Sequence, residues 1–320
     1  MAVNRDKPDQ WKQDIAQSVD MYNDWFMRFA PEAYRTTRVQ TTKDVEATLV
    51  ATKNLTDVRL ELLTAKPSVL PSLRMCTCPP LAVDRLVGLA GVSGHLVKTM
   101  EKHSRLPPRM PKRELDRDLK RIGEIIEKMA DMDVFVWLER GDDPSKQELY
   151  RAATIVADRL CGAVANPIIR NAQEKRQLTA IDDWLTALGY RHLPPGEGTN
   201  YDDLQPGTYS FRLNVPVEQE ASAKTVNIPV DVVVMPNAPK AEEFPLLIEA
   251  KSAGDFTNVN KRRKEEATKM SQLRRTYGDN VRYILFLCGY FDSGYLGYEA
   301  AEGIDWVWEH RINDLGEFGL

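Results

Sequence analysis

Apolar residues in the first half of the chain recur at helical spacing. Between residues 9 and 30, spacings of three and four separate the large apolar positions Trp11, Ile15, Val19, Tyr22, Trp25, Phe26 and Phe29. This spacing predicts an amphipathic helix with one buried face, and Pro31 is expected to end it. Further helices are expected over about 42–64, 82–102, 113–129 and 145–163. Residues 1–165 are therefore predicted to form a helical region.

The pattern changes near residue 166. Asn166 followed by Pro167 predicts the start of a helix, and Gly189 predicts its end. Beyond this helix, apolar runs separated by Pro, Asn and Gly predict strands over 211–216, 225–235, 244–251 and 281–288. A charged helix is expected over about 260–277, between the last two strands. We therefore predict an α/β domain over residues 166–320.

Composition and charge narrow the class of protein. Apolar residues make up 42% of the chain and charged residues 28%, which is ordinary globular usage. The net charge is −4, which excludes a histone-like coat but leaves room for a local basic surface that meets phosphates. No run of 18 apolar residues occurs and the first 30 residues are highly charged, so we expect a cytoplasmic protein. The four cysteines are too few for a disulfide framework.

Charged residues at the ends of two predicted strands are the clearest candidates for chemistry. Asp231 interrupts the apolar run 228–234, while Glu249 and Lys251 stand two apart at the end of the next run. Side chains two apart in a strand share a face, so the three groups converge if these strands pair. Two carboxylates are suitable ligands for Mg²⁺, and a nearby ammonium can orient water or offset charge on a phosphate.

The sequence Pro229-Val230-Asp231 together with Glu249-Ala250-Lys251 resembles the PD-(D/E)XK nuclease signature, with one residue inserted between the proline and the aspartate. A Glu-x-Lys triplet alone arises by chance about once in a chain of this length. Its position at the end of an apolar strand, after an acidic strand and before a basic helix, makes it more specific. The alternative is an internal cluster of ion pairs without a catalytic role.

Glu174 is a further candidate on the helix predicted after Pro167. It lies four residues before Leu178, on the same stripe as Ile181 and Leu185, and a carboxylate on a buried face needs a partner. The PD-(D/E)XK resemblance suggests that Glu174 is an accessory acid, which binds a second metal or orients the motif lysine. The alternative is an ion pair with Arg170, one helical turn earlier.

Two segments are candidates for DNA contact. Residues 251–275 carry eight basic and three acidic residues, and the proposed contacts are Lys261, Arg262, Arg263 and Lys264. Residues 84–100 place a Gly-Val-Ser turn between two short helical patterns, which loosely resembles a helix-turn-helix with Ser93, His95 and Lys98 as its DNA contacts. The alternatives are a solvated helix face for the first segment and plain helix packing for the second.

Several segments together resemble the XamI family of type II restriction endonucleases. They are the helical first half, the stretch PPLAVDRLVGLAGV at 79–92 and the stretch NPIIRNAQEKRQ at 166–177. The resemblance implies a restriction-endonuclease-like PD-(D/E)XK core with a mixed β-sheet flanked by helices. It also implies Mg²⁺-dependent cleavage of double-stranded DNA at a short palindrome, with GTCGAC as the expected sequence.

The same resemblance implies roles for residues and partners. Asp231, Glu249 and the backbone carbonyl of Ala250 would hold Mg²⁺, Lys251 would position the nucleophile, and the products would carry 5′-phosphates. A homodimer is expected because a palindrome is two-fold symmetric, and a cognate DNA methyltransferase is expected in the same system. Two other interpretations remain open: a non-catalytic helix-turn-helix regulator that binds DNA, and a less specific PD-(D/E)XK nuclease of the repair type.

Overall fold

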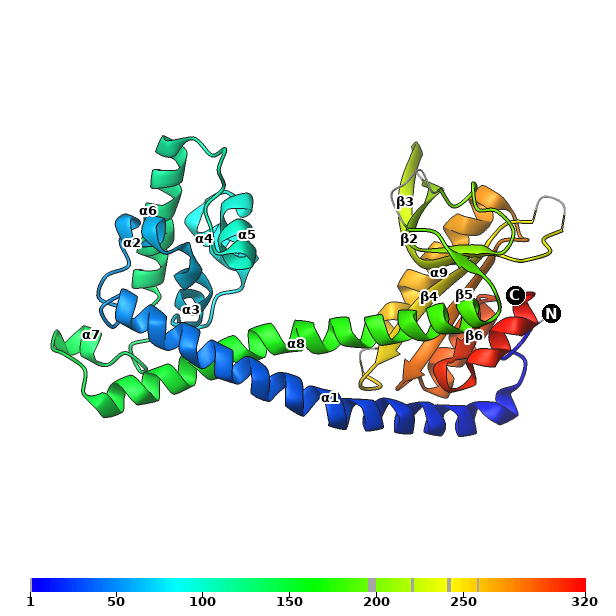
Figure 1. Cartoon of the computed structure of the whole chain (residues 1–320), viewed down its shortest axis with the longest axis horizontal. Coiled ribbons are helices and arrows are strands. Elements are labelled where there is room, and N and C mark those ends of the chain that lie inside the picture. The colour runs from blue at the N-terminus through cyan, green and yellow to red at the C-terminus, as the bar shows by residue number, and fades with distance from the viewer. Residues whose placement is uncertain (1, 195–199, 220–221, 241–242, 258) are drawn as a thin grey trace. The chain divides into compact units, whose positions relative to one another are not determined.

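A computed structural model of the chain describes residues 2–194, 200–219, 222–240, 243–257 and 259–320, without the side chains of 222–224 and 260–263 (Figure 1). The chain divides into two compact units. Unit 1 contains residues 1–29 and 170–320, and unit 2 contains residues 30–169. The division at 169/170 lies close to the boundary expected at 165/166, whereas residues 1–29 belong with the second half of the chain.

Unit 2 is helical. Two long helices, α1 (Pro8–Ala51) and α8 (Lys146–Ala187), contribute to it and also extend into unit 1. Between them come α2 (Leu60–Ala65), η1 (Pro67–Val69), α3 (Leu70–Met75), α4 (Val83–Ala90), α5 (Gly94–His103), α6 (Lys112–Lys128) and α7 (Trp137–Arg140). Their apolar faces share one core, in which Leu70, Leu96, Ile122 and Trp137 are fully or almost fully buried.

Both predictions of a helix boundary at a proline are wrong. Pro31 lies inside α1 and Pro167 lies inside α8, so neither residue ends or begins a helix. A proline in a helix interior removes one backbone hydrogen bond and costs about 3 kcal/mol. Helices of 44 and 42 residues retain many other bonds and packing contacts that outweigh this loss. Each proline lies within three residues of a division between units 1 and 2.

One 18-residue window of α8 has a mean hydropathy of 1.3, so that length and composition alone would allow this helix to cross a membrane. The same test is passed by core helices of globular domains. In unit 2, Val156 and Leu160 of α8 pack into the helical core, and Arg159 pairs with Asp131 at 2.7 Å. These are the contacts of a packed helix, and the window therefore carries no membrane assignment.

Unit 1 is built on a mixed sheet, in which the described residues form six strands in sequence order. The strands are β1 (Arg191–His192), β2 (Thr208–Gln219), β3 (Ser222–Met235), β4 (Leu246–Ala253), β5 (Arg282–Gly289) and β6 (Asp305–Trp308). The pairs β2·β3 and β3·β4 are antiparallel, and β1·β2, β4·β5 and β5·β6 are parallel. The predicted mixed sheet flanked by helices is confirmed. The two strands that were not predicted, β1 and β6, have only two and four residues.

Helices cover both faces of this sheet (Figure 1). On one face, Leu247 and Leu285 pack with Leu273 of α9 (Val259–Tyr277) and with residues of α10 (Ser293–Ala301). On the other face, Ile248 and Phe286 pack with the last turns of α8 and with η2 (Glu309–Phe318). Burial of each such side chain stabilises the fold by about 1.5–3 kcal/mol. The alternation along β4 and β5 therefore fixes which side chains face α9.

The first residues of the chain are bound to β6. The backbone N–H groups of Val3, Asn4 and Arg5 donate to the Asp305 carboxylate at 2.6, 3.0 and 3.1 Å. Val3 and Asp305 are both buried, so these charge-assisted hydrogen bonds are shielded from water. This contact explains why residues 1–29 belong to unit 1, although their helical pattern groups them with the first half of the sequence.

Candidate active site

Strands β3 and β4 bring Asp231 and Glu249 together at the point where they separate. The ladder pairs Val234 with Leu246 and ends where Val232 pairs with Ile248. One further step in this register sets Asp231 opposite Glu249. In place of a continued ladder, the Ala250 N–H donates to Asp231 Oδ2 at 2.9 Å. The Asp231 side chain thus fixes the backbone of β4 directly between the two motif residues.

A kink in the β2–β3 pair places Asp231 at a change of face. The regular pairing of these strands omits Arg212, which has a φ of +55° and lies across from Asp231. Before the kink, Phe211 packs with the α8 face of the sheet, whereas Leu213 beyond it packs with the α9 face. Because strand residues of the same parity normally share a face, the alternation has shifted at Arg212. Because the face changes at this position, the Asp231 side chain need not join either of the two apolar faces.

Glu249 and Lys251 belong to a network that also contains two residues of α9. Lys251 Nζ lies 2.9 Å from Glu249 Oε1 and 2.9 Å from Glu266 Oε1. Lys269 Nζ approaches the same Glu249 oxygen at 2.6 Å. Glu266 is fully buried, and Tyr283 of β5 donates a hydrogen bond to it. The motif lysine is therefore held between two carboxylates.

Burial and neighbouring charges change the acidity of two motif residues. Burial is the main cause that raises the pKa of Asp231 to about 6, and the nearby Glu249 carboxylate adds to the effect. Burial alone would lower the pKa of Lys251, but the carboxylates of Glu249 and Glu266 outweigh it, and that pKa lies above its ordinary value. Lys251 therefore stays protonated at neutral pH and acts as a fixed positive charge.

A cavity of about 340 Å³ joins these groups to α8. Its lining combines two carboxylates of the sheet, the motif lysine and polar residues of α8 and α9: Arg170, Gln173, Glu174, Gln177, Asp231, Glu249, Ala250, Lys251, Ser252 and Glu265. Glu249 Oε2 and Gln173 Nε2 are buried and have no hydrogen-bond partner among the described residues. A buried carboxylate oxygen without a donor is suited to bind a cation or a protonated ligand.

The oxygen atoms at this cavity fit a hard divalent cation. Asp231 and Glu249 offer carboxylate oxygens, and Ala250 lines the same space. No group of three or more His, Cys, Asp or Glu side chains that could hold a metal ion occurs in the described part of the chain. A Mg²⁺ ion here would therefore complete its coordination with main-chain, water or phosphate oxygens, as this ion commonly does.

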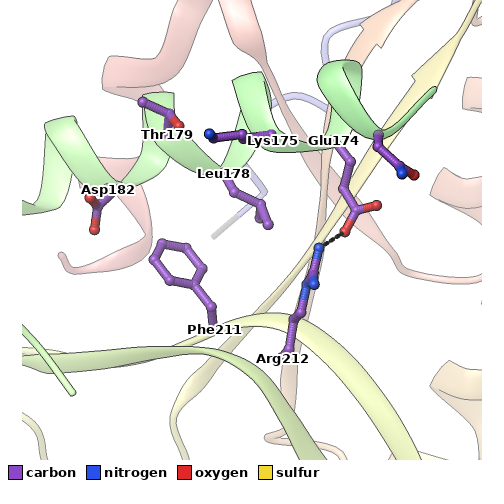
Figure 2. Close-up of a pocket in the computed structure, with 8 residues that line it drawn as sticks. Glu174, Lys175, Leu178, Thr179, Asp182, Phe211 and Arg212 are labelled. Atoms are coloured by element: carbon purple, nitrogen blue, oxygen red, sulfur yellow. Dashed lines mark hydrogen bonds and ion pairs between the residues drawn. The ribbon is translucent and has the colours of Figure 1, made fainter. Parts of the chain in front are cut away.

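Glu174 lines the cavity, but its surroundings differ from the expectation. Its side chain is 42% exposed, and its partner is Arg212 of β2 at 2.5 Å, not Arg170 (Figure 2). Ile181 and Leu185 are buried as expected, but the buried stripe continues through Gln177 and not through Leu178. One turn before Gln177 this stripe reaches position 173, so Glu174 lies at its edge. Glu174 is therefore a rim residue that shares the cavity with Asp231 and Glu249.

Three residues of the site were missed by the sequence analysis. Gln177 is buried, and its Nε2 donates to the carbonyls of Lys251 and Phe286 at 3.2 Å each, which joins α8 to β4 and β5. Gln177 lies one helical turn before Ile181, and this spacing indicates that it shares the buried face of the helix. Glu266 and Lys269 lie three apart on α9, where the sequence pattern indicated only a charged helix.

The proposed DNA contacts fall into two groups. On α9 the side chains of Lys261, Arg262 and Arg263 lie outside the described residues, and Lys264 is exposed. In unit 2, α4 and α5 form two short helices joined through Gly91, as the sequence predicted. His95 and Lys98 are exposed on α5, and Lys98 lies 3.9 Å from Asp84. The backbone N–H of Ser93 donates to buried Asp118 at 3.0 Å.

The fold and the sequence define a class of protein: the chain belongs to the XamI restriction endonuclease family, whose model matches residues 53–308. A relative in this class is the type II restriction enzyme SalI of Streptomyces albus G. It is 52% identical over 317 residues, which cover 99% of each chain. The resemblance to this family and the prediction of an endonuclease are thus confirmed, and the non-catalytic regulator is excluded.

Among solved structures, protein VC1899 from Vibrio cholerae matches with 11% identity and a TM-score of 0.29. The match covers 79% of this chain and 54% of that chain. A similarity this weak carries no argument about fold or function.

Proposed function

We propose that this protein is a Mg²⁺-dependent type II restriction endonuclease with a PD-(D/E)XK core, which cuts both strands of DNA at a short palindrome. The observation that carries the proposal is the convergence of Asp231, Glu249 and Lys251 on one cavity at the end of β4. This arrangement occurs in a chain of a restriction endonuclease family. The proposed recognition sequence, GTCGAC, rests on the family resemblance.

The cofactor of this proposal is Mg²⁺, held by Asp231, Glu249 and the carbonyl of Ala250. The buried Glu249 Oε2, which has no hydrogen-bond donor among the described residues, is the atom that best supports a cation here. When bound, Mg²⁺ supplies a Lewis acid that polarises the phosphate and favours ionisation of water. The Ala250 N–H holds Asp231 by one oxygen and leaves the other free.

Lys251 acts in this proposal as a positive charge beside the phosphate. Because its ammonium is held by Glu249 and Glu266, it is positioned before DNA arrives. Preorganised charge is effective in catalysis because it needs no reorganisation when negative charge develops on the phosphate. The raised pKa of Lys251 argues against its use as a general base, since that role needs a neutral amine.

The proposed partners are double-stranded DNA, a second copy of the chain and a DNA methyltransferase. Unit 2 would read or clamp DNA, with His95 and Lys98 of α5 exposed for contact. A homodimer is proposed because a palindrome presents two equivalent scissile bonds. We further propose a cytoplasmic location and a cognate methyltransferase that protects host DNA.

The first test is cleavage of a plasmid with a single GTCGAC sequence by the purified protein. A second plasmid carries a one-base change in that sequence, and parallel reactions contain Mg²⁺ or EDTA. We expect one linear product with 5′-phosphate ends, only from the first plasmid and only with Mg²⁺. Discrete fragments at another sequence would refute GTCGAC alone, and a smear would favour the repair-type nuclease. Intact DNA in every reaction would refute the proposed function.

A further inference from the structure

The structure points to a residue at the rim of the site that contacts the DNA backbone. Resting on the proposed function, we propose that Arg212 binds a phosphate of the DNA strand that enters the cavity, and that it exchanges Glu174 for this phosphate. Arg212 would then be a positioning residue for the cleavage reaction. Three observations on the described residues support this inference: its backbone, its ion pair and the groove beside it.

The backbone of Arg212 is unusual for a strand residue. Its φ of +55° falls in the left-handed region, which residues other than glycine avoid because of contacts with Cβ. The other non-glycine residues described with positive φ are Lys53, Asn54 and Leu55, which follow α1, and Ser104, which follows α5. Arg212 alone among them lies within a strand, and it lies across from Asp231. Strained residues of this kind cluster at functional sites.

The ion pair of Arg212 does not account for this strain. The Arg212 and Glu174 side chains are 65% and 42% exposed, and one bond of 2.5 Å joins them. Exposed pairs contribute little to stability because water screens both charges. Arg212 also has unused donors, since a guanidinium has five N–H groups and can bind two oxygens of one phosphate. The pair is therefore suited to exchange its carboxylate for a phosphate.

A groove next to the catalytic cavity provides the space for a DNA strand. It has a volume of about 610 Å³ and lies between α8 and β2, and the bonded pair of Arg212 and Glu174 joins these two elements at one side of it (Figure 2). Asn171, Lys175 and Thr179 of α8 line the same groove and offer further donors to phosphate oxygens. Glu174 lines both the groove and the catalytic cavity. A phosphate bound to Arg212 would therefore lie on the strand next to Asp231, beside the catalytic cavity, and would release Glu174.

The test is DNA binding by Arg212→Gly, without metal and at several salt concentrations. Glycine adopts the observed φ without strain, so this variant removes the guanidinium while the kink remains. By fluorescence anisotropy in EDTA with a labelled GTCGAC duplex, we expect binding about tenfold weaker and a salt dependence reduced by about one phosphate contact. We expect Arg212→Lys to restore part of the affinity, because it keeps the charge but not the fork.

Glu174→Gln distinguishes exchange from a static role. It removes the carboxylate that competes for Arg212, so we expect several-fold tighter DNA binding in EDTA. The double variant Glu174→Gln/Arg212→Gly should not show this tighter binding. If Glu174 acts only by competing for Arg212, the effects of the two substitutions on DNA affinity are not additive. The control is Arg28→Ala, an exposed arginine of α1 whose described bond is to the Asp24 carbonyl, and binding should not change.

Two results overturn the inference. One is wild-type affinity and salt dependence in Arg212→Gly with an unchanged melting temperature, which would leave Arg212 a purely structural residue. The other is a gain from Glu174→Gln that persists without Arg212, which would make Glu174 a general repulsive charge. In either case the wild-type protein would still cut DNA. Failure of the wild type to cut or bind any duplex would instead refute the proposed function.

Discussion

Units 1 and 2 bury charged side chains in different ways. In unit 2, Arg74 meets Glu101 through two bonds of 2.8 and 2.7 Å, and Arg159 meets Asp131 at 2.7 Å. In unit 1, Glu249 and Glu266 share the ammonium groups of Lys251 and Lys269, and the Asp231 carboxylate, which accepts from the Ala250 N–H, lies beside Glu249. Among the described side chains, buried polar atoms without a hydrogen-bond partner occur in unit 1 and not in unit 2. Complete pairs are typical of structural roles, whereas an incomplete cluster is typical of a binding site.

The largest effect is expected from removal of a charge in the incomplete cluster. Asp231→Asn and Lys251→Ala should each lower single-turnover cleavage of a GTCGAC duplex by about 10²- to 10³-fold or more, because the charges act on the reacting phosphate. DNA binding in EDTA should persist in Asp231→Asn. Cleavage by Lys251→Ala at the wild-type rate would show that the cluster is an ion-pair network without catalytic function.

Removal of one partner of a complete pair should affect folding instead. In Arg74→Ala the nearly buried Glu101 loses both bonds, and breaking such a pair costs about 3 kcal/mol. Urea unfolding followed by circular dichroism measures the loss. The control is Arg38→Ala, whose pair with Asp158 is mostly exposed and should change stability by less than about 1 kcal/mol. Equal effects of the two variants would contradict the contrast between buried and exposed pairs.

The pH dependence of stability tests whether the ionised, buried Asp231 carboxylate destabilises the folded protein. The pKa of Asp231 is about 6 in the folded protein and about 3.8 in an unfolded chain, so the folded state retains its proton longer. Between about pH 4 and pH 6, the free energy of unfolding should therefore fall as pH rises, relative to Asp231→Asn, which cannot titrate. Unfolding in EDTA at several pH values measures the difference between the two proteins. A constant difference across this range would contradict the raised pKa.

A smaller effect is expected from Lys269, which shares the Glu249 Oε1 oxygen with Lys251. Lys269→Met removes an ammonium that competes for a candidate metal ligand. We expect several-fold tighter Ca²⁺ binding to the DNA-free protein by isothermal titration calorimetry. Lys264→Met, an exposed position on the same helix, is the control and should bind Ca²⁺ as the wild type does. Weaker binding in Lys269→Met would show that Lys269 orients Glu249 for the metal.

The sequence predicted the four longer strands and the convergence of Asp231, Glu249 and Lys251, because alternation along a strand fixes which residues share a face. It did not predict that α1 and α8 continue through Pro31 and Pro167. A proline indicates the local loss of a helix hydrogen bond, but the sequence does not show the packing that outweighs this loss. The prolines instead fall near the divisions between units. The pairing of Glu174 with Arg212 could not be predicted from the sequence either, because it depends on the left-handed backbone conformation of Arg212 in β2.

The bonds from Val3, Asn4 and Arg5 to Asp305 have a consequence for synthesis of the protein. Unit 2 is one continuous segment, whereas unit 1 is formed from two segments on either side of it. On the ribosome, unit 2 can therefore fold first, while the initial 29 residues wait for a strand that is translated more than 270 residues later. Unit 1 would thus be completed only after β6 has been translated, so that a chain interrupted before Asp305 lacks the partner of its own first residues.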